Sequence, residues 1–542
     1  MKKISVLCAC LSLAVILLSP APARAQVACD PNDPLYADLT LWEENGLLPY
    51  LPPLRPYPQQ LLVRLLEQVA EKGHEADKAK AEKYLAALGQ PLPAIHLSLY
   101  NRSMTAGTDY GQESALQASF GGSFNPLFSF SGRIAAWSIL DPGDNLLPRY
   151  TYTANDYHKD WASVDVAGHS IGVYQGLTAG GAFGTDKAYF QSGLMRSSFG
   201  PFFADGAVLN PSAPHAGHFS FTYRGKAFTF TALLLALTAT DVDPTDDDPD
   251  DPGNMEFYPD KFLALHALTF NPRPWWELGV FETVIYGGRF DPLYLIPVSE
   301  LTYSQGVMGL EDNSLVGASA RFRLPSSLNL AFLFYLDDIH FNDLVRFDFK
   351  TKYKFALQAG LTWTPLGDLL KRLSLEYLAV MPYTYTHKSQ SADDTEPNYL
   401  NYTHMGMNLG TTLEPNSDRI GLKALLEPWK DTELELFFKM IRHGNASEGI
   451  AGDTHYNDGS IFDDGYDDDG KANFQSETRF LTQSVIEHVF QSGFAIALRL
   501  PFYRGALSVG GGYTFEYILN KGLQKGENDV NHYLSLEVGY TF

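Results

Sequence analysis

The stretch His532-Tyr533-Leu534-Ser535-Leu536-Glu537-Val538-Gly539-Tyr540-Thr541-Phe542 decides the fold. Alternate residues from Leu534 to Phe542 are apolar, and the residues between them are polar or small. Because side chains of a β-strand alternate between its two faces, one face of this strand is continuously apolar. That face is too long and too aromatic for a solvated edge strand. A strand buried in a soluble sandwich is the alternative to a strand that faces lipid.

The final phenylalanine favours the lipid-facing interpretation. An aromatic residue that ends an apolar strand face resembles the assembly signal of bacterial outer-membrane β-barrels, whose strands are apolar outside and polar inside. The resemblance implies that the barrel-assembly machinery recognises the strand ending at Phe542. It also implies that the outer surface contacts outer-membrane lipids.

Residues 1–25 have the features of a cleavable signal peptide. Lys2 and Lys3 precede an apolar stretch over 6–18, and Ala23-Arg24-Ala25 is a suitable cleavage site. We therefore expect secretion across the inner membrane and a location in the outer membrane of a diderm bacterium. Beyond residue 25, no apolar run approaches the roughly 18 residues that a membrane helix needs.

Charge and cysteine content exclude several function classes. The sequence carries a net charge of −23, which argues against nucleic-acid binding and against anionic partners without bridging cations. Two of its three cysteines lie within residues 1–25, so Cys29 would remain alone and no disulfide could form within the mature chain. Lipidation of Cys29 is a weaker alternative, because the preceding residues make a poor lipidation signal.

Residues 26–92 are expected to form three short amphipathic helices. Asp33 is a suitable N-cap for the first, and Gly46 can end it. A proline-rich connector separates it from a second helix around Leu61, and a third is expected to begin at Glu75. Such helices cannot bury their apolar stripes alone. We expect them to plug or cap the periplasmic mouth of a larger β-structure.

Residues 93–542 have the period-two pattern of strands. Clear examples lie at 355–363, 433–440, 494–500 and 507–519. Tight turns alternate with longer polar loops, as in barrels with short periplasmic turns and long external loops. The sequence therefore predicts a mostly β protein, a transmembrane antiparallel β-barrel of about 18 strands, whose lumen could be open or plugged.

Two acidic runs, at 241–251 and 463–470, are candidates for weak Ca²⁺ binding, because Ca²⁺ prefers oxygen ligands. The predicted ligands are Asp463, Asp464, Asp467, Asp468 and Asp469. These residues do not have the spacing of an EF-hand, so a solvated external loop is the more ordinary interpretation.

No motif requires an enzyme. Asp337, Asp338 and His340 could be read as acid and base for water activation, but acidic pairs near a histidine are common by chance. The sequence has no phosphate-binding Gly-rich loop, no H-E-x-x-H, no G-x-S-x-G and no C-x-x-C. We therefore expect no catalytic activity.

Residues 281–297 resemble a segment of the Wzi family of capsule-assembly outer-membrane proteins. Other similar segments are Ser197-Ser198-Phe199-Gly200-Pro201, Asp312-Asn313-Ser314-Leu315-Val316-Gly317, Tyr335-Leu336-Asp337-Asp338, Asp33-Pro34-Leu35-Tyr36 and Arg442-His443-Gly444-Asn445. The resemblance implies an eighteen-stranded barrel closed by N-terminal helices and inward loops. It also implies a lectin-like role that holds capsular or other surface polysaccharide at the cell surface.

The charged residues of this region are too numerous for a lipid-facing band. We expect Glu282, Arg289, Asp291, Asp312, Asp337 and Asp338 to form a cluster of paired charges inside the lumen. Sugar recognition would instead use aromatic rings near carboxylates. The predicted polysaccharide contacts are Tyr399, Tyr402, Tyr456 and Tyr466, on external loops. A porin or solute channel is the alternative function if the lumen is open.

Overall fold

The computed structural model describes residues 30–88, 94–140, 146–151, 160–166, 169–240, 256–296, 299–309, 312–339, 346, 353–365, 367, 369–387, 397–445, 461, 479–502 and 505–542. The predicted signal peptide, Cys29 and both acidic runs lie outside these ranges.

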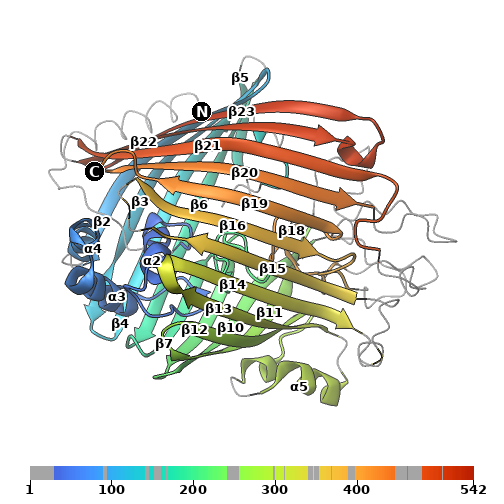
Figure 1. The fold of residues 1–542 in the computed structure, drawn as a ribbon, viewed down its shortest axis with the longest axis horizontal. Helices are drawn as coiled ribbons and strands as arrows, with labels where there is room; N and C mark the ends of the chain where they lie inside the picture. Colours follow the sequence, from blue (N-terminus) through green and yellow to red (C-terminus); the bar gives the residue numbers. More distant parts are fainter. Residues whose placement is uncertain are drawn as a thin grey trace.

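Eighteen antiparallel strands form one closed barrel (Figure 1), which confirms the predicted fold class. In order around the wall they are β2 (Ala94–Ala106), β3 (Asp109–Asn125), β4 (Phe128–Leu140), β6 (His169–Gly184), β7 (Ala188–Met195), β9 (Ala216–Arg224), β10 (Phe228–Thr240), β11 (Phe257–Arg273), β12 (Trp276–Gly287), β13 (Asn313–Leu324), β14 (Leu328–Ile339), β15 (Tyr353–Trp363), β16 (Leu370–Val380), β19 (Ser417–Leu426), β20 (Thr432–Gly444), β21 (Ile486–Phe502), β22 (Gly505–Leu519) and β23 (Asn528–Thr541). Pairing of β23 with β2, where Ser98 faces Thr541, closes the ring. β5 (Asp160–Val166) pairs with β6 beside this wall.

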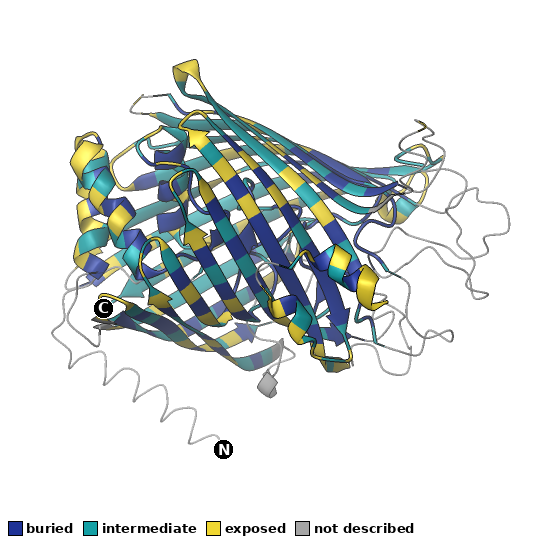
Figure 2. Ribbon diagram, turned by 90° about the horizontal axis from the view of Figure 1, so that it is seen from below, coloured by how far each residue is buried: buried dark blue, intermediate teal, exposed yellow. Residues whose placement is uncertain are grey.

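Alternation along the strands separates a lipid-facing surface from the lumen. Leu534, Leu536 and Val538 of β23 are exposed on the outside, and Glu537 lies on the opposite face. Figure 2 shows the same alternation of exposed and buried positions along other strands of the wall. An outer surface rich in exposed Leu, Phe and Val side chains is the surface that an outer-membrane barrel presents to lipid.

The two ends of the barrel differ in their connections. One end has tight turns, such as those between β9 and β10 and between β13 and β14. The other end has the long connections, which include the segments 196–215 and 381–416. Short turns face the periplasm in outer-membrane barrels, so the long connections lie toward the cell exterior.

Three N-terminal helices lie at the periplasmic end: α2 (Pro34–Glu44), α3 (Gln59–Lys72) and α4 (Glu75–Leu88) (Figure 1). Asp33 accepts a hydrogen bond from the Leu35 N–H at 2.9 Å, which confirms its predicted role as N-cap. The helices share a buried apolar core to which all three contribute, including Leu39, Leu61, Leu65 and Ala81. None of the described helices is long and apolar enough to cross a membrane.

Short elements complete the fold. Two strand pairs lie apart from the wall, β1 (Leu54–Arg55) with β8 (Ser198–Phe199) and β17 (Thr403–His404) with β18 (Met407–Asn408). The remaining helical elements of the described residues are η2 (Pro292–Leu295), α5 (Leu301–Met308), η3 (Pro325–Ser327) and η4 (Lys521–Leu523). In Figure 1, α5 lies outside the wall, at the end opposite to α2–α4.

Candidate functional site: the plugged lumen and its outer face

Among the described residues, three segments that are far apart in the sequence fill one side of the lumen. The connector after α2 enters the barrel and pairs with the segment 196–215, so that Leu54 lies opposite Phe199 and Arg55 opposite Ser198. The described parts of the segment 381–416, residues 381–387 and 397–416, contact the same region, because Tyr402 donates a hydrogen bond to the Val208 carbonyl at 2.9 Å. Together these three segments are the plug of the barrel.

An apolar core joins the plug to one side of the wall. It contains plug residues such as Leu54, Phe199 and Leu409 together with inward residues of β10–β16 such as Leu265 and Leu333. Aromatic rings form its centre, since Tyr335 lies 5.9 Å from Tyr402 and Tyr385 lies 5.3 Å from Tyr402, between ring centroids. Such a core excludes water from this side of the lumen.

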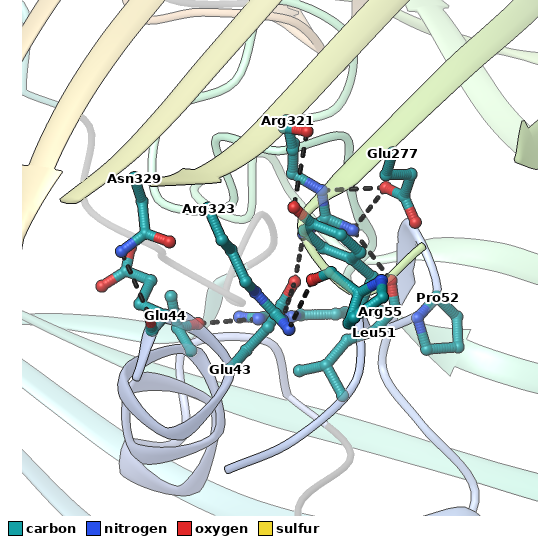
Figure 3. Close-up of polar contacts among 12 residues, drawn as sticks. Glu43, Glu44, Leu51, Pro52, Arg55, Glu277, Arg321, Arg323 and Asn329 are labelled. Carbon is teal, nitrogen blue, oxygen red and sulfur yellow. Dashed lines mark hydrogen bonds and ion pairs between the residues drawn. The ribbon is translucent and has the colours of Figure 1, made fainter. Parts of the chain in front are cut away.

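Charged contacts fix the periplasmic part of the plug to the wall (Figure 3). Arg321 of β13 lies between two carboxylates, Glu43 of α2 and Glu277 of β12, with nitrogen–oxygen distances of 2.5 Å to each. It also donates to the Leu51 carbonyl at 3.2 Å, and its guanidinium lies 4.7 Å from the ring centroid of Tyr50. Burial raises the pKa of Tyr50 to about 12, so this ring stays neutral beside the cation.

A second set of contacts lies next to the first, at Glu44, and Figure 3 shows its hydrogen bond with Asn329. Arg372 of β16 donates from two nitrogens to the carboxylate of Glu44, at 2.9 and 2.8 Å, in the bidentate geometry that suits arginine. Asn329 donates to the Glu44 carbonyl at 3.1 Å. The end of α2 is therefore held by three strands on one side of the wall, β13, β14 and β16.

Deeper in the lumen, Asp205 links the two inward loops. It forms an ion pair with Arg419 of β19 and accepts hydrogen bonds from Thr412 N–H at 3.2 Å and Thr412 Oγ1–H at 3.1 Å. Burial opposes ionisation of Asp205, but Arg419 and these donors outweigh it, so the pKa of Asp205 lies below its ordinary value. The carboxylate therefore stays charged and keeps both loops against β19.

The other side of the lumen, along β19–β23 and β2, is polar and only partly filled. Inward side chains there include Lys423, Glu435 and Glu537, which are 43, 40 and 42 % exposed. Toward the exterior, the segment 146–151 lies across this side. Arg149 N–H donates to Glu516 at 2.9 Å, and Gln491 donates to the Arg149 carbonyl at 2.8 Å. The segment 146–151 therefore narrows the space along the polar side of the lumen at its exterior end.

The predicted charge cluster is split by the wall, and its placement in the lumen is wrong for most members. Glu282 shares the outward face of β12 with Leu278 and Val280, both exposed. Arg289, Asp291 and Asp312 lie beside it under α5, outside the barrel. Asp337 does point inward and accepts from the Tyr385 N–H at 2.7 Å. The side chain of Asp338 lies outside the described residues.

The predicted sugar contacts also differ from one another in where the structure places them. Tyr402 is completely buried between Tyr335 and Tyr385, so the prediction that its ring offers a stacking surface is wrong. Tyr399 is partly exposed and packs against the backbone at Gly287. Tyr456, Tyr466 and the predicted Ca²⁺ ligands Asp463, Asp464, Asp467, Asp468 and Asp469 lie outside the described residues.

The residues that hold the plug were not predicted from the sequence. Arg321 and Arg323 alternate with apolar residues on β13, which is the signal that could have placed both in the lumen. Nothing local to Glu43 or Asp205 indicates which arginine each would meet.

These features define a plugged outer-membrane-type β-barrel. A solved structure of similar fold is Wzi of Escherichia coli, described as an outer-membrane carbohydrate-binding β-barrel involved in group 1 capsule assembly, with a TM-score of 0.56 at 12 % identity over 96 % of this chain and 99 % of that one. The resemblance to this family in the sequence is thus confirmed at the level of the fold.

Other solved structures match less well. Pseudomonas aeruginosa OprD matches with a TM-score of 0.41 at 8 % identity, over 83 % of this chain and 95 % of that one, and OccD3 of the same organism gives 0.40 at 10 % identity, over 83 % and 91 %. By sequence, no family model and no curated protein matches.

Proposed function

We propose that the protein is a carbohydrate-binding barrel that holds capsular or other surface polysaccharide at the outer face of the outer membrane. The observation that carries this proposal is the plug. Two inward loops and the N-terminal connector share one apolar core with the wall, so the barrel presents folded loops to the exterior. The fold likeness to the E. coli carbohydrate-binding barrel supports the same function.

The proposed contacts are aromatic rings on the external loops. Among the described residues, Tyr399 fits best, because it is partly exposed on the exterior part of the plug and is held against Gly287. A ring fixed in this way loses little conformational freedom when it stacks on a sugar. We propose Tyr456 and Tyr466 as further contacts, and we propose no enzymatic step.

The test is binding of polysaccharide extracted from the surface of the source cells, separated into acidic and neutral fractions. The Tyr399→Ala variant should bind about tenfold more weakly, which corresponds to about 1.4 kcal/mol. Trp429→Ala is the matched control, because Trp429 is an exposed aromatic residue in the turn between β19 and β20 at the opposite end. If neither fraction binds the unaltered protein, the proposal is rejected.

We further propose that Ca²⁺ bridges the acidic loop to anionic sugars, because a chain with a net charge of −23 repels them. Chelation, or a change of Asp463, Asp464, Asp467, Asp468 and Asp469 to Asn, should abolish binding of the acidic fraction and spare the neutral one. If the acidic fraction binds as well after chelation as before it, the calcium bridge is excluded.

A second candidate function is a narrow solute channel, favoured by the partly exposed charges along β19–β23. It predicts steady ion conductance by the unaltered barrel in planar bilayers. The polysaccharide-binding proposal predicts low conductance together with measurable glycan binding, so the two measurements separate the candidates.

A further inference from the structure

The segment between β12 and β13 packs against the outside of the barrel. It contains η2 and α5, and its apolar core includes Tyr294 and Leu301 together with the outward wall residues Val284 and Tyr286. Figure 2 shows α5 lying against the outer surface of the wall. A helix in this position covers part of the outer surface of the wall, whereas the same surface of the neighbouring strands remains exposed.

The wall beneath α5 lies within the lipid-facing band. Glu282 points outward, and the residues level with it on the next strands are Val316, Leu336 and Phe355. One step closer to the periplasm on the same face, Val280 is 60 % exposed. A carboxylate in this apolar row would be costly against hydrocarbon unless other groups satisfied it.

The beginning of α5 satisfies this carboxylate. The N–H groups of Leu301 and Thr302 donate to the two oxygens of Glu282 at 2.9 and 3.4 Å, and His266 lies 3.5 Å away. The first N–H groups of a helix have no partner within it, so Glu282 and α5 satisfy each other. This contact fixes the depth of α5 at the level of Glu282.

A second polar contact closes the other side of the segment. Arg289 forms a 2.5 Å ion pair with Asp312, and the Tyr294 hydroxyl donates to the same carboxylate at 2.6 Å. The side chain of Asp312 has no exposed surface. The carboxylate of Asp312 is thus shielded beneath the segment, and Glu300, the N-cap of α5, remains exposed.

The outward face of α5 is apolar. Tyr303, Val307 and Met308 are 73, 65 and 64 % exposed, whereas Leu301 and Gln305 face the barrel. Phe290, Leu295 and Ile296 extend the same exposed apolar surface across the segment before α5.

We infer that α5 is embedded in the outer leaflet of the outer membrane, where its outward face contacts the acyl chains of the lipid. The depth set by Glu282 and the continuity with exposed Val280 both place this face against hydrocarbon. A second protein is a poorer occupant, because eight residues span only about 12 Å, too little for the roughly 800 Å² per partner of a stable interface. This inference concerns membrane contact and is independent of polysaccharide binding.

Lipid quenching tests the inference. Single cysteines are introduced as Tyr303→Cys and Val307→Cys into a chain whose native cysteines are serine, labelled with an environment-sensitive fluorophore, and reconstituted into phosphatidylcholine vesicles. Val280→Cys is the control for lipid contact, and Lys525→Cys, in the exposed connection between β22 and β23, is the control for water.

Labels at 303 and 307 should lose about as much emission as the label at 280 when the acyl chains carry bromine, and should resist aqueous iodide. Labels that behave like the one at 525 would overturn the inference. Emission that depends on the protein-to-lipid ratio, with cross-linking between copies through position 303, would assign this face to a second copy and would also overturn it.

Discussion

Arg321 and Glu43 are 278 positions apart in the sequence, and their side chains meet at 2.5 Å between β13 and α2. Both side chains are nearly buried, with 12 and 5 % of their surface exposed. Glu277 contacts the same guanidinium from the neighbouring strand. One arginine therefore neutralises a carboxylate of the plug and a carboxylate of the wall, and it connects the two.

Replacement of Arg321 by alanine should release the periplasmic part of the plug. The change removes the cation that lies 2.5 Å from both Glu43 and Glu277 and leaves Glu43 with the more distant Arg323, at 3.8 Å. Breaking a buried pair in this way costs about 3–5 kcal/mol. We expect an intact barrel with markedly higher single-channel conductance in planar bilayers.

Lys423→Ala is the control for this experiment, since its 3.5 Å pair with Glu435 is exposed and such pairs contribute about 0–1 kcal/mol. Unchanged conductance in the Arg321→Ala barrel would show that the plug does not depend on this contact.

A disulfide between β1 and β8 should lock the released plug. Leu54 and Phe199 lie directly opposite each other in this antiparallel pair, at the spacing a disulfide can bridge. In an Arg321→Ala chain with Cys29→Ser, the changes Leu54→Cys and Phe199→Cys should give low conductance when oxidised and high conductance when reduced. The single change Leu54→Cys should show no response to reductant. A reductant response in that control would contradict the assignment to the β1–β8 contact.

Replacement of Glu282 by alanine should loosen α5 without affecting the barrel. Leu301 and Thr302 would lose the acceptor for their N–H groups, at a cost of about 1–3 kcal/mol. Amide hydrogen exchange over 299–309 should become about tenfold faster or more. Glu527→Ala, in the exposed connection between β22 and β23, is the control and should leave this segment unchanged. Equal protection in both variants would mean that the helix is held by its apolar contacts alone.

Acid should stabilise the beginning of α2. Burial raises the pKa of Asp33 from 3.8 to about 6, with a smaller opposing effect of its hydrogen bond from Leu35. The folded state therefore binds this proton more tightly than the unfolded state does. The resulting stabilisation is complete below about pH 4 and is lost as the pH rises through about 6.

Hydrogen exchange of α2, corrected for intrinsic rates, should accordingly be several-fold slower at about pH 5 than at about pH 7.5. In Asp33→Asn, which keeps a capping side chain but does not titrate, the difference should vanish. A persistent difference would assign the effect to another group.

Removal of Phe542 should reduce barrel assembly. This residue continues the outward row of Leu536, Val538 and Tyr540, and its N–H donates to the Leu97 carbonyl at 2.8 Å on the closing strand β2. We expect a several-fold loss of heat-modifiable, assembled protein in outer membranes, with degraded chain in the periplasm. Phe270→Ala, an exposed lipid-facing change on β11, should assemble normally. Normal assembly without Phe542 would show that the last strand is recognised by other features.

The sequence by itself determined the features that depend on neighbouring residues. The alternation from Leu534 to Phe542 predicted a strand with one apolar face, and Asp33 predicted the start of α2. Both predictions are confirmed, because a strand's two faces and a helix cap are set within a few residues. Repetition of the strand pattern, with short turns at one end, was enough to predict the barrel and its approximate number of strands.

Tertiary structure decided where charges and rings lie. Glu282 lies on the same outward face of β12 as the exposed Val280. A carboxylate is tolerated on that face because α5 folds back and supplies two N–H groups. Tyr402 became part of the core because its loop enters the lumen and meets Tyr335. Arg321 holds the plug against the wall through Glu43. No local sequence pattern indicates this partner, because it lies 278 positions away. In each case the free energy of a polar or aromatic group depends on groups that only folding brings near, so composition and periodicity could not assign these positions.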